Sequence, residues 1–96
     1  MITGKTEKGF EFEVSENVGT DFRIVEATAK FKSGQPLQRI TGMYDLISTV
    51  LGEKGIERMK AFAVEQCGYA DTNFIMDQVD EIIGIANEKA PEIKKS

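Results

Sequence analysis

Apolar and acidic residues alternate strictly in the segment GFEFEV, residues 9–14. This alternation has the period of a half-buried β-strand. One face would carry Phe10, Phe12 and Val14, and the other Glu11 and Glu13. The preceding residues MITGKTE can supply a partner strand after a turn at Glu7-Lys8-Gly9, where glycine allows positive φ. Because a lone hairpin is marginal in water, we expect its apolar face to lie on helices.

Residues 21–32 permit two interpretations. After a candidate N-cap at Thr20 or Asp21, apolar residues recur at helical spacing: Phe22, Val25 and Ala29. The same segment also permits a strand through residues 23–31. We favour the helix because Gly34-Gln35-Pro36 is a strong stop signal, with Gly34 suited to the left-handed position after the last turn.

Two amphipathic helices are predicted next, on either side of Gly52. The first begins at a cap on Thr41, and its apolar stripe is Met43, Leu46, Ile47, Val50 and Leu51. The second ends at Gly68, and its stripe is Ile56, Met59, Phe62, Ala63 and Cys67. A glycine inside a helix costs about 1 kcal/mol relative to alanine. We therefore expect the second helix to begin after Gly55, near Ile56.

The segment ADTNFIMDQVDEIIGIANEK, residues 70–89, predicts a last helix capped by Asp71 or Thr72. Its stripe is Ile75, Val79, Ile82, Ile83 and Ala86. The polar residues that follow indicate a flexible C-terminal tail over residues 90–96. The expected fold is α+β, a single domain over residues 1–89 in which a short N-terminal β-hairpin packs on a bundle of about four α-helices.

The charge of the chain narrows the classes of partner. Its 96 residues carry a formal net charge of −4, and the sequence pI is about 4.8. An acidic domain is repelled by phosphate backbones and by anionic membrane surfaces, so we expect neither nucleic acid nor a membrane as a partner. The single cysteine, Cys67, has no partner within the chain, and no apolar run resembles a signal peptide or a membrane span. A cytoplasmic location is the simplest expectation.

The sequence lacks the residues expected of an enzyme or a metal site. It has no histidine, the commonest general base and a frequent zinc ligand. GKT at residues 4–6 lacks the upstream glycine of a phosphate-binding loop. DTNFIMDQVDEI, residues 71–82, has apolar residues where a calcium loop needs oxygen ligands and a glycine. Cys67 lies at a helix C-terminus, where the helix dipole disfavours a thiolate. We therefore expect no catalytic residue, no cofactor and no metal.

The stretch LGEKGIERMKAF, residues 51–62, raises the alternative of a DNA-reading helix-turn-helix. The second helix of such a motif presents basic and amide side chains to the bases. Here the charges are balanced, with Glu53, Glu57 and Glu65 against Lys54, Arg58 and Lys60. The favoured interpretation is therefore that these two helices pack within the domain.

Five segments stand in a distinctive order and spacing, although each is short. They are KTEKGFEFEV (5–14), DFRIVEATAKFKSGQPL (21–37), LG (51–52) followed by ERMK, GYADTNFIMDQVDEI (68–82) and KKS (94–96). Taken together they resemble the short tail assembly chaperones of bacteriophages and prophages, which are encoded just before the tape-measure protein. The resemblance covers nearly the whole chain, and Gly55 departs from it.

The resemblance implies a non-enzymatic function. Such chaperones coat the long, hydrophobic, helical tape-measure protein in the host cytoplasm and keep it soluble until tail-tube subunits replace them. They are not expected in the mature virion. In many of these phages a programmed frameshift adds a C-terminal extension, and Lys94-Lys95 is compatible with the A-rich run that such a shift uses.

A chaperone needs apolar surface beyond what its own core uses. Phe74 and Ile85 lie beside the stripe of the last helix, and Phe62 and Val64 lie on adjacent faces of the helix before it. We expect these four residues to bind the partner, and the same surfaces can serve self-association into a homo-oligomer. The alternative is that such wide apolar arcs only fill a small core. The rival function is a small acidic regulatory or adaptor protein with a helix-turn-helix-like domain.

Overall fold

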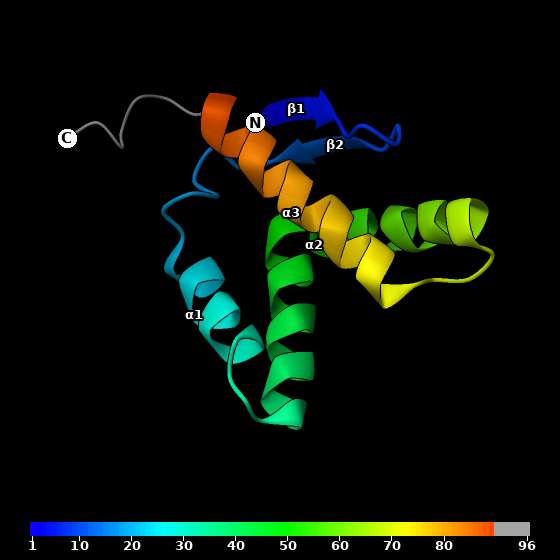
Figure 1. The fold of residues 1–96 in the computed structure, drawn as a ribbon. Coiled ribbons are helices and arrows are strands. Elements are labelled where there is room, and N and C mark those ends of the chain that lie inside the picture. Colours follow the sequence, from blue (N-terminus) through cyan, green and yellow to red (C-terminus); the bar gives the residue numbers. More distant parts are fainter. Residues whose placement is uncertain (90–96) are drawn as a thin grey trace.

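The computed structural model describes residues 1–89, and the tail expected over residues 90–96 lies outside the described residues. The elements, in chain order, are β1 (Ile2–Lys5), β2 (Glu11–Val14), α1 (Phe22–Phe31), α2 (Pro36–Cys67) and α3 (Thr72–Lys89). Figure 1 shows α1 beside the first part of α2, and the hairpin next to α3. The arrangement is α+β as expected, but residues 1–89 form a hairpin and three helices rather than about four.

The hairpin forms as its alternating pattern predicts. β1 and β2 pair antiparallel with Ile2 opposite Val14, and the turn between them passes through Gly9, whose φ is 108°. Its apolar side chains are buried: Ile2, Phe10, Phe12 and Val14. The Lys89 ammonium donates to the Thr3 carbonyl at 2.8 Å, so the end of α3 holds β1. The hairpin therefore lies on helices, as expected.

α1 is a helix rather than a strand, with Asp21 as its N-cap. One carboxylate oxygen of Asp21 accepts the backbone N–H of Arg23 at 2.9 Å. The buried residues of α1 are Ile24 and Ala27. The predicted stripe is wrong, because its residues are exposed: Phe22, Val25 and Ala29.

Gly42 on α2 decides which side of α1 is buried. A Cβ atom at residue 42 would lie 2.6 Å from the carbonyl oxygen of Ala27, which is closer than atoms can pack. The two helices therefore approach each other through small residues, Ala27 on one and Gly42 on the other. The bulkier Phe22 and Val25 are left on the opposite, exposed side.

The connection from α1 to α2 is shorter than predicted. α1 closes at Lys32, whose φ of −87° and ψ of 0° are right-handed, so Gly34 is not a left-handed cap. α2 begins at Pro36 rather than after Thr41. The fixed φ of proline suits the first turn of a helix, where its missing N–H costs nothing. Pro36 therefore follows the end of α1 and is also the first residue of α2.

α2 bends at Gly52, whose φ of 75° and ψ of 172° lie outside the helical region. We call residues 36–51 the first arm of α2 and residues 53–67 its second arm, and Figure 1 shows them running in different directions. They correspond to the two helices predicted on either side of Gly52, except that the second arm begins directly after Gly52 and contains Gly55. Gly68 ends α2 as predicted, with a φ of 88°.

The bend also bears on the helix-turn-helix alternative. In that motif a turn of about three or four residues joins two helices. Here one non-helical residue, Gly52, joins the two arms. The geometry of α2 therefore differs from that of the motif.

α3 begins and ends where the sequence predicts. Asp71 caps it, since its carboxylate accepts the Asn73 N–H at 2.9 Å. The predicted stripe is buried or partly buried against the core. The largest fully buried side chains of the described residues are Met59, Ile82, Val14 and Val79. The core is formed by the hairpin, both arms of α2 and α3, with Ile24 and Ala27 of α1 packed at its edge. Across residues 1–89, none of the helices has the length and apolar content needed to cross a bilayer.

Candidate interaction surfaces

Two of the four predicted partner-binding residues, Phe62 and Phe74, lie together. Their ring centroids are 5.8 Å apart, and the Phe62 ring lies 5.4 Å from that of Phe10. Phe10 is buried, whereas Phe62 and Phe74 are partly buried against the core. The Arg58 guanidinium lies over the Phe10 ring, 4.9 Å from its centroid. The two predicted residues therefore complete the edge of the core and leave only part of their surface free.

Val64 and Ile85, the other two predicted residues, differ in exposure. Val64 is 48% exposed on the second arm of α2, whereas Ile85 is partly buried against the core. Val64 follows Phe62 by two residues, so the two side chains point to different sides of the helix. Val64 is the most exposed of the four, and partner binding by any of them stays a prediction.

A row of exposed apolar residues lies on the first arm of α2. Leu37, Ile40 and Tyr44 are 79%, 62% and 63% exposed. Their spacing of three and four residues places them on one face of the helix. We call these three residues the first-arm stripe. The sequence pattern does not predict this row when the helix is taken to begin at Thr41, whereas Pro36, as a helix-start signal, would have included it.

The first-arm stripe leads to a small cavity inside the bend of α2. The cavity has a volume of about 150 Å³. It is lined by Tyr44 and Ile47 of the first arm, Ile56, Met59 and Lys60 of the second arm, and Ile75 of α3. The bend at Gly52 therefore places an apolar recess at the end of an exposed apolar row.

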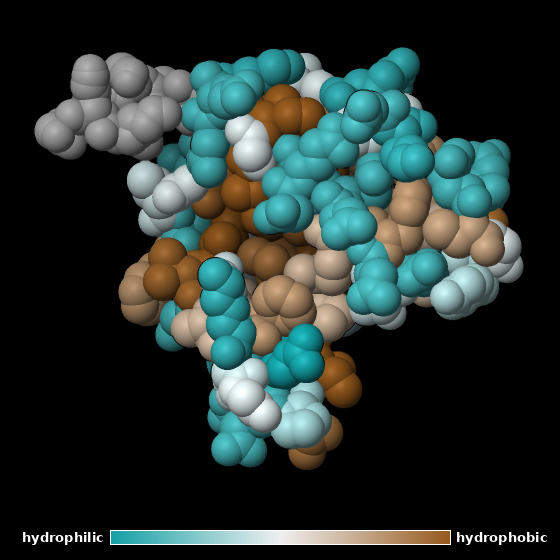
Figure 2. Space-filling model, viewed as in Figure 1, coloured by the Kyte–Doolittle hydropathy of each residue, from teal (hydrophilic) through white to brown (hydrophobic). Residues whose placement is uncertain are grey.

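A second cavity, of about 380 Å³, lies between α1 and α3 over the first arm of α2. Its apolar lining consists of Ile24 and Phe31 of α1, Leu46 of α2, and Met76 and Ile83 of α3. Asp77 and Asp80 stand on its α3 side, and Lys32 stands on its α1 side. We call this cavity the α1/α3 groove. Figure 2 shows brown, apolar side chains in the hollow between α1 and α3, with teal, hydrophilic ones along α3.

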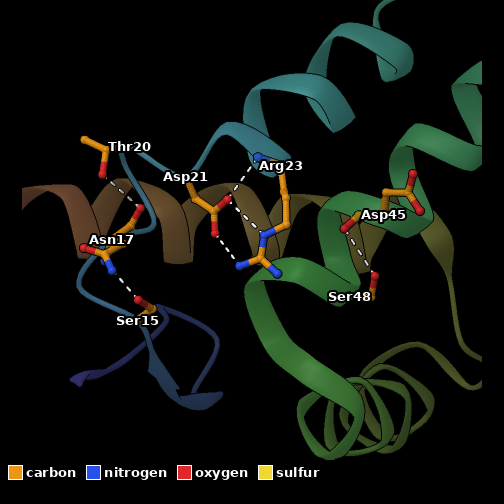
Figure 3. Close-up of polar contacts among 7 residues, drawn as sticks. All are labelled: Ser15, Asn17, Thr20, Asp21, Arg23, Asp45 and Ser48. Atoms are coloured by element: carbon orange, nitrogen blue, oxygen red, sulfur yellow. Dashed lines mark hydrogen bonds and ion pairs between the residues drawn. The ribbon is translucent and has the colours of Figure 1, made fainter.

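Polar contacts lie at both ends of α1, one wall of the α1/α3 groove, and Figure 3 draws the Asp21–Arg23 and Asp45–Ser48 contacts among them. At the start of α1 the Asp21 carboxylate accepts two side-chain N–H groups of Arg23, at 2.6 and 3.0 Å. These hydrogen bonds hold the pKa of the Asp21 carboxyl below its ordinary value of 3.8. Near the end of α1, Lys30 pairs with Asp45 of the first arm at 3.5 Å. The Ser48 hydroxyl in turn donates to the Asp45 carbonyl at 3.2 Å. Of these contacts, the Lys30–Asp45 ion pair joins α1 to the first arm, whereas the Asp21–Arg23 hydrogen bonds lie within the start of α1 itself.

Metal-binding clusters are absent from residues 1–89, where no group of three or more histidine, cysteine, aspartate or glutamate side chains is placed to hold an ion. Cys67 is a free, exposed thiol at the end of α2. Comparisons of the chain with known protein families, curated proteins and solved structures found no match.

Proposed function

We propose that the chain is a non-enzymatic phage tail assembly chaperone, which binds the tape-measure protein and keeps it soluble during tail assembly. The order of the sequence segments supports this function, and so does one structural observation, the uncovered apolar surface of α1 and α2. Five large apolar side chains on these two helices are between 53% and 79% exposed: Phe22, Val25, Leu37, Ile40 and Tyr44.

The arrangement of these side chains matters more than their number. Single exposed apolar residues are normal on protein surfaces. Here three of them form the first-arm stripe at helical spacing, and such a row suits contact with the apolar face of another helix. A long, hydrophobic, helical protein such as a tape-measure protein offers matching rows along its length. The net charge of −4 opposes aggregation of the domain while its exposed apolar residues are not covered by a partner.

Co-expression with the tape-measure protein of the same phage genome tests the proposal. We expect the soluble fraction of the tape-measure protein, measured after centrifugation of the lysate, to rise when this chain is present. An unrelated acidic domain of similar size, expressed at the same level, controls for a general effect of co-expression. An equal soluble fraction with the chain and with the control domain would contradict the proposal.

A further inference from the structure

The α1/α3 groove combines an apolar lining with unpaired charges. Ile24 and Leu46 at its base are buried, whereas Asp77 and Asp80 are exposed above them. Within residues 1–89 neither aspartate forms an ion pair, and Lys32 across the groove forms none either. The α3 edge therefore carries two free negative charges beside an apolar surface.

The walls and charges of the groove define the chemistry of what can fill it. Both walls are helices, whose backbone hydrogen bonds are made internally, so an occupant binds through side chains rather than by adding a strand. The apolar lining favours a row of apolar side chains. Asp77 and Asp80 favour lysine or arginine beside that row and repel acidic residues. A second copy of this chain, with its net charge of −4, is disfavoured at this edge for the same reason.

We infer that the α1/α3 groove is the seat of an amphipathic helix of the client protein, whose apolar row lies against Met76 and Ile83 and whose basic flank faces Asp77 and Asp80. This inference rests on the proposed function and names the surface and the client chemistry that the function would use. Lys32 on the opposite wall favours an acidic flank on that side of the bound helix. Because reversing the helix would exchange its two flanks, the charges of the groove also select the chain direction in which the helix binds.

Synthetic peptides that tile the tape-measure protein test the inference by fluorescence polarisation at low ionic strength. We expect peptides with an apolar row and flanking lysine or arginine to bind the full chain. Asp77→Lys with Asp80→Lys is expected to weaken their binding about tenfold, because attraction becomes repulsion. Glu53→Lys with Glu65→Lys on the second arm is the matched control, since it changes the net charge equally at two other exposed acids. The control is expected to bind within about twofold of the wild type.

Exchange of charge between the partners gives a sharper readout. A peptide whose flanking lysines are replaced by glutamate is expected to bind the variant with Asp77→Lys and Asp80→Lys more tightly than it binds the wild type. Equal binding by the wild type and this variant would overturn the inference, and so would an equal loss in the control variant. If the lysine variant fails to fold by circular dichroism, Asp77→Asn with Asp80→Asn removes the same charges. Weaker binding by that variant supports the inference, and unchanged binding overturns it.

Methyl NMR and the solubility assay separate this inference from the proposed function. On addition of the tightest peptide we expect the Met76 methyl signal to shift and the methyl signals of Val14, which is buried in the hairpin, to stay. An unchanged Met76 signal would overturn the seat in the groove. If wild type and groove variant keep the full tape-measure protein equally soluble, only the inference about the groove fails. If the wild type does not keep it soluble, the proposed function fails.

Discussion

Gln78 of α3 is a polar side chain in an apolar place. It is 3% exposed, and its side-chain carbonyl oxygen has no hydrogen-bond partner among residues 1–89. A buried acceptor without a partner costs about 1–3 kcal/mol. We expect Gln78→Met, which keeps the length of the side chain, to raise the free energy of unfolding by about 1 kcal/mol. Urea unfolding followed by circular dichroism measures the change.

A second glutamine supplies the control for this substitution. Gln66 is exposed near the end of α2, so Gln66→Met is expected to leave the free energy of unfolding within about 0.5 kcal/mol of the wild type. A loss of stability in Gln78→Met would contradict the expectation. It would show that the Gln78 amide makes a contact that outweighs its unpaired oxygen.

Gly52 and Gly84 are both glycines within helical elements, and alanine is expected to have opposite effects at them. The φ of 75° and ψ of 172° at Gly52 lie in a region that is essentially restricted to glycine, so Gly52→Ala should destabilise the protein by about 1–3 kcal/mol. Gly84 has no positive φ, and a Cβ there would meet no atom within 4 Å. Gly84→Ala should therefore stabilise α3 by about 1 kcal/mol.

Thermal unfolding of the two alanine variants beside the wild type measures both effects. A lower midpoint for Gly52→Ala and a higher one for Gly84→Ala is the expected order. If Gly52→Ala kept wild-type stability, the bend of α2 would not depend on the backbone freedom of residue 52. The two arms would then be held apart by their contacts with α1 and α3 alone.

Local signals in the sequence predict the ends of elements well. Asp21 and Asp71 cap their helices, Gly68 ends α2, and the alternation around Phe12 gives the hairpin, because each signal acts within a few residues. The start of α2 was predicted wrongly, at Thr41, for a local reason too. Pro36 is compatible with the first turn of a helix as well as with the region after one, and we interpreted it only as the end signal of the preceding helix.

The faces of helices and the candidate surfaces depend on contacts between distant residues. α1 carries apolar residues on two sides, and the contact of Ala27 with Gly42 of α2 decides which side is buried. The spacing of residues within α1 cannot reveal this contact. The α1/α3 groove likewise exists only because α1 and α3 flank the first arm of α2. Phe62 and Phe74 were chosen as apolar residues, and only the fold shows that they complete the core edge beside Phe10.

The shape of the whole molecule explains why apolar surface is left uncovered. The principal extents of its Cα trace are 43 × 32 × 20 Å. The Cα atoms of two packed helices, with axes about 8–10 Å apart and a Cα radius of about 2.3 Å, span about 13–15 Å, so the smallest extent leaves room for little more than two layers of helices. In so thin a molecule every helix has one side in water. Both arms of α2 contribute buried residues, Leu46 and Val50 from the first and Met59 and Ala63 from the second, while Leu37, Ile40 and Tyr44 of the first arm stay exposed.

Net charge and the first-arm stripe have opposite effects on self-association of the whole molecule. At pH 7 two copies repel each other through a net charge of −4, and this repulsion vanishes near the sequence pI of about 4.8. Apolar attraction remains at both pH values. We therefore expect sedimentation velocity to show association that increases as the pH falls from 7 toward 4.8. Salt at neutral pH should act in the same direction, because it screens the repulsion.

Two variants show which surface carries this association. Leu37→Gln with Ile40→Gln removes two exposed residues of the first-arm stripe, and it is expected to keep the chain monomeric under conditions in which the wild type associates. Val64→Gln changes an exposed apolar residue of the second arm and is expected to associate like the wild type. The reverse order would place the contact between copies at Val64, on the surface predicted from the sequence. Equal association in all three chains would mean that neither the first-arm stripe nor Val64 carries the contact between copies.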